Sequence, residues 1–123
     1  MQFTTNIEYK GMTERFVGWL CSELDINPSF VMVEGQHVVG GSLLGMCIDE
    51  DVDRFIVIVK TGNRTVTDIF VTIAHEMIHV KQHIKQGLGD LLQGCEIPYM
   101  ERWWEIEAFQ DSVKYVERFA KMI

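Results

Sequence analysis

Apolar residues recur at helical spacing near the start of the chain. Between residues 11 and 25 they stand three or four positions apart, and Asn27 followed by Pro28 ends the pattern. This spacing places apolar side chains on one face of an α-helix, and an Asn-Pro pair is typical of a chain that leaves a helix. The pattern therefore predicts a helix over residues 11–25. The apolar positions are Met12, Phe16, Val17, Trp19, Leu20 and Leu24.

Three short runs rich in β-branched and other apolar residues follow the first helix. They cover residues 30–33, 42–48 and 55–60, and the last run reads Phe-Ile-Val-Ile-Val-Lys. A continuous apolar run of this length is typical of a buried strand. Between the second and third runs, residues 49–53 are mostly acidic, which suits a solvated hairpin connection. The sequence predicts a small sheet of about three strands.

The longest helical pattern lies between Thr65 and Gly87. Thr65 with Asp68 three residues later resembles a capping box, and Gly87 is a typical helix end. One apolar stripe consists of Val66, Ile69, Ile73, Met77, Val80 and Ile84, and a second of Val71, Ala74 and Ile78. A helix that is apolar on two sides is expected to be packed between two layers.

The chain ends with a loop and another helix. Residues 87–100 contain three glycines and a proline, and from residue 101 to 122 helical spacing returns. The predicted buried stripe of this last helix is Ile106, Phe109, Val113, Val116 and Ala120. We therefore expect one α+β domain over residues 1–123, with the small sheet packed on a central helix and with flanking N-terminal and C-terminal helices.

Composition disfavours nucleic acid and membrane as partners. The chain has 123 residues, of which 47% are hydrophobic, and a formal net charge of -7. This length allows one domain with a sizeable core, whereas a surface that neutralises phosphate needs positive charge. No run of about 18 apolar residues occurs, and the first residues have neither a basic nor an apolar leader segment. We expect a cytoplasmic protein.

The cysteines give no sign of a metal site or a disulfide framework. Cys21, Cys47 and Cys95 are odd in number and form no CxxC pair. Thiolate zinc sites and disulfide scaffolds both depend on paired cysteines. Reduced thiols are therefore expected.

The central helix contains the sequence HEMIH at residues 75–79, an HExxH motif. Histidines four residues apart lie one turn above each other, so the imidazoles of His75 and His79 can bind the same tetrahedral ion. Glu76 then lies near the metal but off the ligand face, where it can take a proton from water. The motif indicates a zinc site with Glu76 as the general base.

A zinc site that leaves one position open for water needs a third protein ligand. His83 lies about 12 Å along the axis of a straight helix from His75, so we expect it to be a solvent or rim residue. The last helix offers Glu105 and Glu107, which point in nearly opposite directions. Glu105 falls within roughly 40° of the centre of the apolar stripe, whereas Glu107 points away. The pattern favours Glu105, with Glu107 as the alternative third ligand.

With HExxH and a downstream Glu-x-x-Ala, the chain resembles the gluzincin metallopeptidases. The segment WEIEA at residues 104–108 is similar to that of the minimal zincins often found in bacteria and their phages. The resemblance covers residues 65–120. It implies that His75, His79 and a glutamate of the last helix bind zinc, and that Glu76 is the catalytic base.

The resemblance leaves the choice of glutamate open. Many gluzincins have an aspartate four residues after the third ligand. That position is Phe109 after Glu105, but it is Asp111 after Glu107. The family pattern therefore supports Glu107, against the helical-face argument for Glu105.

The sequence thus predicts a peptidase that acts on a peptide or protein with Zn²⁺ as cofactor. The alternative is an inactive interaction module in which zinc only stabilises the fold. The resemblance also implies that a sheet strand pairs with extended substrate, and the glycine-containing residues 40–47 are the candidate; a weak edge strand is the competing interpretation. Tyr99, Tyr115 and His83 are available to stabilise an oxyanion, although aromatics before a helix more often serve packing.

Overall fold

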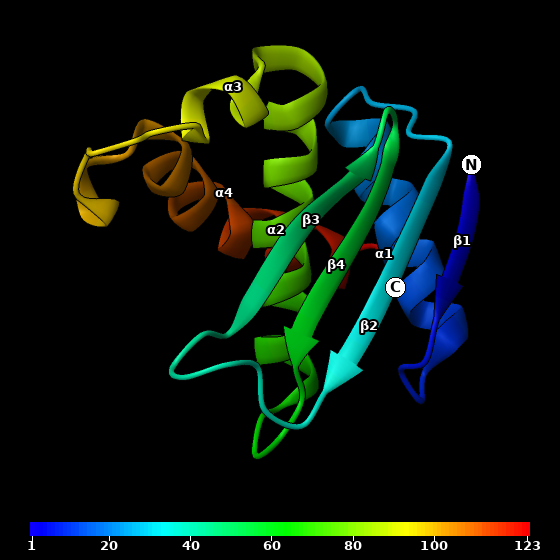
Figure 1. Ribbon diagram of the computed structural model, residues 1–123. Helices are drawn as coiled ribbons and strands as arrows, with labels where there is room; N and C mark the ends of the chain where they lie inside the picture. Colours follow the sequence, from blue (N-terminus) through cyan, green and yellow to red (C-terminus); the bar gives the residue numbers. More distant parts are fainter.

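Four strands form one mixed sheet, and the long helices lie behind it in Figure 1. The computed structural model describes residues 1–123. The strands are β1 Gln2–Thr5, β2 Phe30–Gln36, β3 Gly45–Asp51 and β4 Arg54–Lys60, and their order in the sheet is β1-β2-β4-β3. The helices are α1 Lys10–Glu23, α2 Val66–Gln86, α3 Leu88–Leu92, the 3-10 turn η1 Tyr99–Glu101, and α4 Trp103–Ala120. The predicted α+β class is confirmed, but the sheet has four strands and not three.

The unpredicted strand is β1, which runs parallel to β2 with Phe3 opposite Val31. Its contacts are with residues about thirty positions away: the Thr5 hydroxyl donates to the carbonyl of Val33 at 2.7 Å. A strand of four residues with one large apolar side chain has too little alternation to be recognised by pattern. Strand β1 therefore forms because it pairs with β2, and not because of its own sequence pattern.

Strand β3 lies at the edge of the sheet and pairs antiparallel with β4. It was predicted over residues 42–48, but it begins at Gly45 and continues to Asp51. Its acidic end pairs with β4, since Asp49 lies opposite Phe55. The turn is therefore confined to Val52 and Asp53, and Asp53 has a positive φ of 67°.

The ends of α2 are as the sequence predicts. The Thr65 side chain accepts a hydrogen bond from the backbone amide of Asp68, and the Asp68 carboxylate accepts one from the amide of Thr65, which completes the capping box. At the other end Gly87 is left-handed, with φ 65°. Although α2 has 21 residues, no helix of the protein, α2 included, has the combination of length and apolarity that crossing a bilayer requires.

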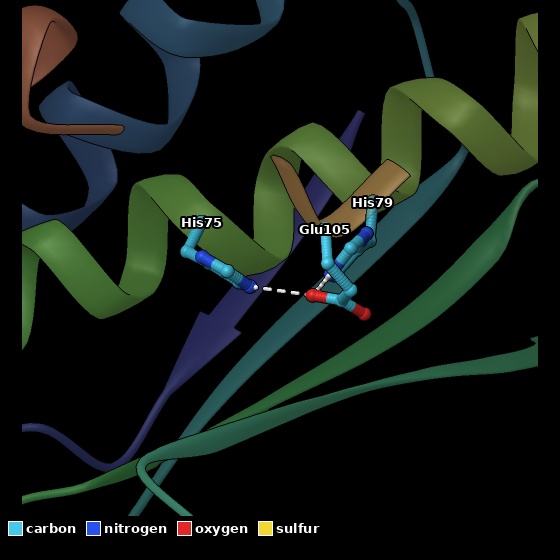
Figure 2. Close-up of side chains that lie close together, drawn as sticks. All are labelled: His75, His79 and Glu105. Atoms are coloured by element: carbon cyan, nitrogen blue, oxygen red, sulfur yellow. Dashed lines mark hydrogen bonds and ion pairs between the residues drawn. The ribbon is translucent and has the colours of Figure 1, made fainter. Parts of the chain in front are cut away.

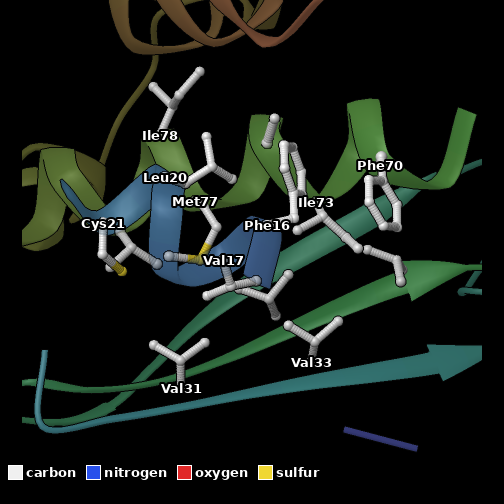
Figure 3. Packing of buried hydrophobic residues seen from close by; sticks show 14 of the residues in the cluster. Phe16, Val17, Leu20, Cys21, Val31, Val33, Phe70, Ile73, Met77 and Ile78 are labelled. Atoms are coloured by element: carbon white, nitrogen blue, oxygen red, sulfur yellow. The ribbon is translucent and has the colours of Figure 1, made fainter. Parts of the chain in front are cut away.

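Helices α1 and α2 bury their apolar faces against the sheet (Figure 3). Phe16 of α1 stacks on Phe70 of α2, with ring centroids 4.7 Å apart. Ile73 and Met77 of α2 are completely buried, as are the β2 side chains that face the helices. The second apolar strip of α2 is also buried at Ala74 and Ile78, so α2 is packed on two sides as predicted.

Helix α4 packs against α2 with a face other than the predicted one. Ile106, Phe109 and Val113, expected in the core, are 40%, 51% and 46% exposed. The buried positions are Trp104, Glu105, Ala108, Ser112 and Phe119. Small side chains at positions 108 and 112 let α4 approach α2 closely, and the larger apolar stripe is left at the surface.

Candidate metal centre

The motif residues of α2 are held in place by the packing of that helix. His75, Glu76 and His79 are 8%, 6% and 6% exposed, although all three are polar. The apolar residues among and around them, Met77 and Ile78 included, are fixed in the core. The sheet on one side and α4 on the other therefore fix the direction of the two imidazoles.

Both histidines point at one carboxylate oxygen (Figure 2). Nε2 of His75 lies 3.1 Å, and Nε2 of His79 3.0 Å, from Oε1 of Glu105 on α4. Glu105 shares the buried face of α4 with Ala108, Ser112 and Phe119, which are spaced at helical periods from it. The structure thus brings together the three residues that the sequence favoured as ligands, although the stripe used to orient Glu105 is not the buried one.

The three side chains suit a single divalent ion. Their ligand atoms all lie within 4.8 Å of one another. Tetrahedral ligands about 2.0–2.1 Å from one zinc ion are about 3.3 Å apart, which is close to the observed nitrogen to oxygen distances. Two neutral imidazoles and one carboxylate form a donor set that holds a metal and leaves a fourth position open. His75, His79 and Glu105 therefore form a candidate metal-binding triad.

The electrostatics of Glu105 also suit a cationic partner. Burial alone would raise its pKa, but hydrogen bonds from His75, His79 and Tyr99 outweigh burial and hold this pKa well below the ordinary value. Three donors converge on Oε1, with the Tyr99 hydroxyl at 2.9 Å. Glu105 is therefore an ionised acceptor at the centre of the triad.

Glu107, the alternative third ligand, faces another way. Its Oε1 accepts hydrogen bonds from Lys81 Nζ at 2.8 Å and from Gln82 Nε2 at 2.9 Å. Asp111, the aspartate that favoured Glu107, forms an ion pair with Lys114 at 3.9 Å. At the position four residues after Glu105, the Phe109 ring packs edge-on against His75, with centroids 4.6 Å apart.

Glu76 lies beside the triad and against β3. A Cβ built on Gly45 would be 3.1 Å from Oε2 of Glu76, so this glycine makes room for the carboxyl group. Burial raises the pKa of Glu76 to about 7, while His75 and His79 oppose the rise. A buried carboxyl group with a pKa near neutrality is suited to taking up and returning a proton.

Of the three candidate oxyanion donors, only Tyr99 contacts the triad. Burial, and then the Glu105 carboxylate, raise the pKa of the Tyr99 phenol above its ordinary value. Tyr115 packs on Trp19 instead, with ring centroids 6.0 Å apart. His83 is not part of the triad, as expected, but its side chain is only 9% exposed: its Nδ1 lies 3.6 Å from Asp49 Oδ2. His83 is thus a wall residue and not a solvated one.

The triad lies between two cavities. One has a volume of about 220 Å³ and extends towards His83, Leu88 and Trp104. The other, about 440 Å³, extends towards Arg64 and Phe109. Five residues line both cavities: Leu43, Gly45, His75, Glu76 and Tyr99. The triad therefore borders both cavities, with β3 on one side and α4 on the other.

Gln82 is a site residue that the sequence did not suggest. Its side chain is completely buried and its Oε1 lies 2.6 Å from Nδ1 of His79. The available signal was its position, three residues after His79 and hence on the same helical face. A glutamine side chain is neither a usual metal ligand nor a general base, so its residue type gave no signal. Its hydrogen-bond partner on α4 is 22 residues away in sequence.

Comparison with protein-family models, curated proteins and solved structures finds no match to this chain.

Proposed function

We propose that this chain is a zinc-dependent metallopeptidase of the gluzincin type, which hydrolyses peptide bonds with Glu76 as the general base. The observation that carries the proposal is the convergence of His75, His79 and Glu105 on one point, with the Glu76 carboxyl group beside them in an open cleft. The zincin fold is part of the same proposal. It is supported by an HExxH helix that packs against a sheet with β3 at the edge beside the site.

The donor set favours zinc over magnesium and calcium. Two imidazoles with one carboxylate are a known ligand set of catalytic zinc, whereas magnesium and calcium prefer oxygen ligands throughout. When bound, zinc supplies Lewis acidity, which polarises a carbonyl group and acidifies water. The buried Glu76 carboxyl group would accept the proton of the attacking water and later return it to the leaving amine. The Tyr99 hydroxyl, which donates to Glu105, would stabilise negative charge on the substrate carbonyl oxygen if it turned from Glu105 to that oxygen.

An extended peptide is the substrate that the edge of the sheet can accept. The carbonyl of Leu44, just before β3, accepts a hydrogen bond from the amide of Lys60 in β4, so the main-chain groups of Leu44 face β4. In an antiparallel ladder neighbouring residues alternate, so the main-chain groups of Gly45 and Cys47 point to the free edge. A peptide that pairs there runs past Glu76 and the triad, and its main chain gains hydrogen bonds whatever its sequence.

The larger cavity indicates which side chains such a peptide carries next to the cleaved bond. Its apolar wall is formed by Leu43, Leu44, Val71 and Phe109. Leu43, Leu44 and Phe109 are 48%, 50% and 51% exposed, so apolar surface borders the cleft on both sides. We therefore propose protein segments with large apolar residues as substrates, and no nucleic acid or membrane partner.

The test separates a peptidase from a module that zinc only stabilises. The wild-type chain and a Glu76→Gln variant are purified, their zinc content is measured, and cleavage of a casein substrate is followed. We expect about one zinc ion in both proteins, with cleavage lost by about 10²–10⁴-fold in the variant. Glu50→Gln is the matched control, because Glu50 is an exposed acid on β3.

Two results would contradict the proposal. A wild-type protein that binds no zinc after metal loading would remove the metal centre. A zinc-loaded wild-type protein that cleaves neither casein nor a library of apolar peptides would leave the interaction module as the better description.

A further inference from the structure

Gln82 is the polar side chain of α2 that is most completely removed from solvent, with an exposure of 0%. All the hydrogen-bonding atoms of its amide are nevertheless used. Oε1 contacts Nδ1 of His79 at 2.6 Å, and Nε2 donates to the carbonyl of Trp104 at 3.0 Å and to Oε1 of Glu107 at 2.9 Å. A buried amide with every donor and acceptor satisfied holds one orientation.

That orientation determines the tautomer of His79. If the amide were reversed, its oxygen would face the Trp104 carbonyl and the Glu107 carboxylate, neither of which can donate. Because the oxygen instead faces Nδ1, and a carbonyl oxygen only accepts, Nδ1 of His79 must carry a proton. Nε2 of the same ring faces the Glu105 carboxylate, to which it donates, and a metal ion that binds in the triad would replace the proton on Nε2.

The nitrogen of the same amide, Nε2 of Gln82, attaches α4 to α2. Its two partners, the Trp104 carbonyl and the Glu107 carboxylate, lie on either side of Glu105 in the first turns of α4. Lys81 reinforces this attachment, because its ammonium group donates to the same Glu107 oxygen at 2.8 Å. Glu105 itself reaches the site only because this turn of α4 is docked on α2. One side chain therefore links two different members of the triad.

We propose that Gln82 is the positioning residue of the metal centre: it orients His79 and docks the turn that carries Glu105, and it thereby sets the affinity for zinc. This inference rests on the zinc site of the proposed function, but it does not depend on peptidase activity. Gln82 is not a member of the triad, so its effect is on the two ligands and not on the chemistry.

The first test compares zinc affinity in Gln82→Met and in the wild type, by competition with a chromogenic chelator. Methionine keeps the length and burial of the side chain but removes its amide. We expect zinc to bind about 10–100-fold more weakly, as is typical when the hydrogen-bond partner of a ligand is lost. Gln86→Met is the matched control: Gln86 is exposed on the last turn of α2, and its loss should leave the affinity unchanged.

The second test reverses the hydrogen bond between Gln82 and Glu107. Gln82→Glu keeps an acceptor for His79 but places a carboxylate against Glu107, so affinity should fall. Adding Glu107→Gln supplies an amide donor in the opposite direction, and the double variant Gln82→Glu/Glu107→Gln should recover at least part of the lost affinity. A packing role alone predicts no such recovery.

The His79 tautomer provides a readout that is independent of affinity. In the zinc-loaded wild type, nitrogen-15 spectra of the histidine rings should show Nδ1 of His79 protonated and in slow exchange. The Gln82→Met variant should exchange this proton faster.

Wild-type affinity in a folded Gln82→Met protein would overturn the inference. If Gln82→Met does not fold, the two glutamate variants decide: a double variant no better than Gln82→Glu overturns it. Failure of the proposed function has a different signature. A chain that binds zinc tightly but cleaves nothing refutes the peptidase and leaves these affinity measurements valid.

Discussion

The carboxyl group of Glu76 lies directly against Gly45 of the edge strand. A Cβ at position 45 would be 3.1 Å from Glu76 Oε2, and it would also meet the Thr72 methyl group at 2.7 Å and the Ile58 carbonyl oxygen at 2.8 Å. The glycine is thus required by the close approach of α2 and β3, and not by its own backbone angles. A side chain here would press on Thr72, on the Ile58 carbonyl and on Glu76, the proposed general base.

Gly45→Ala should therefore impair both stability and catalysis. We expect a loss of about 1–3 kcal/mol in the free energy of unfolding, typical of overpacking, together with a fall in kcat as Glu76 moves. Urea unfolding and peptide hydrolysis measure the two effects. Gly40→Ala is the control, because nothing lies within 4 Å of a Cβ built there. Equal behaviour of the two variants would show that the contact with Glu76 is unimportant.

Zinc should stabilise the folded chain through the triad. A ligand present at about 100 times its dissociation constant adds about 2.7 kcal/mol, which for a domain of this size raises Tm by about 10 °C. Glu105→Gln should abolish the rise in thermal melts with and without zinc, and EDTA should reverse it in the wild type. Glu117→Gln, an exposed change on the same helix, should keep it. A rise that survives Glu105→Gln would mean that the ion binds elsewhere.

Phe109 should affect substrate binding far more than stability. It is 51% exposed, lines the larger cavity and packs on His75. Phe109→Ala should change the free energy of unfolding by no more than about 1 kcal/mol, but raise KM about tenfold for peptides with a large apolar residue at the cleaved bond. Val113→Ala is the matched control, because Val113 is on the same stripe, 46% exposed, and does not line the cavity. The same KM in both variants would exclude Phe109 from the subsite.

Cys21 should make stability depend on pH in the alkaline range. Burial raises the pKa of its thiol to about 11 from the ordinary 9.0, against the opposing effect of the N-terminal amine. The unfolded chain therefore loses this proton at a lower pH than the folded chain. The contribution of the Cys21 thiol to the free energy of unfolding is complete below about pH 9 and is lost as the pH rises towards about 11. Urea unfolding at about pH 8 and about pH 10.5 should show a larger fall for the wild type than for Cys21→Ala, and parallel falls would contradict this assignment.

The long helices are encoded in short-range signals, whereas the short α3 and η1 lie within residues 87–100, which the sequence predicted as a loop. The capping box at Thr65 and the left-handed Gly87 are local features, so both ends of α2 were predictable. Strand β1 was not, because it exists through pairing with β2. The extension of β3 to Asp51 was missed for the same reason: acidic residues indicate a turn, but pairing with β4 continues through them.

The part of the site that lies within the HExxH motif was predictable from the sequence. His75, Glu76 and His79 belong to one helix, so their mutual arrangement follows from helical geometry. The orientation of Glu105 was predicted from the stripe of Ile106, which proved to be exposed, and Glu105 faces inwards because Ala108 and Ser112 form the contact with α2. Tyr99 was one of three candidate oxyanion donors, and only its contact with Glu105 distinguishes it from the other two. Gln82 lies on the helical face of His79, but its attachment to α4 is a tertiary contact that the sequence does not indicate.

The origin of Glu105 on α4 has a consequence for synthesis. His75 and His79 leave the ribosome about thirty residues before their carboxylate partner, and that partner is fixed only when α4 docks on α2. A nascent or truncated chain that has formed the sheet and α2 still lacks a complete set of ligands. A chain without α4 should therefore bind metal more weakly than the full chain, because it has only two of the three residues of the candidate triad.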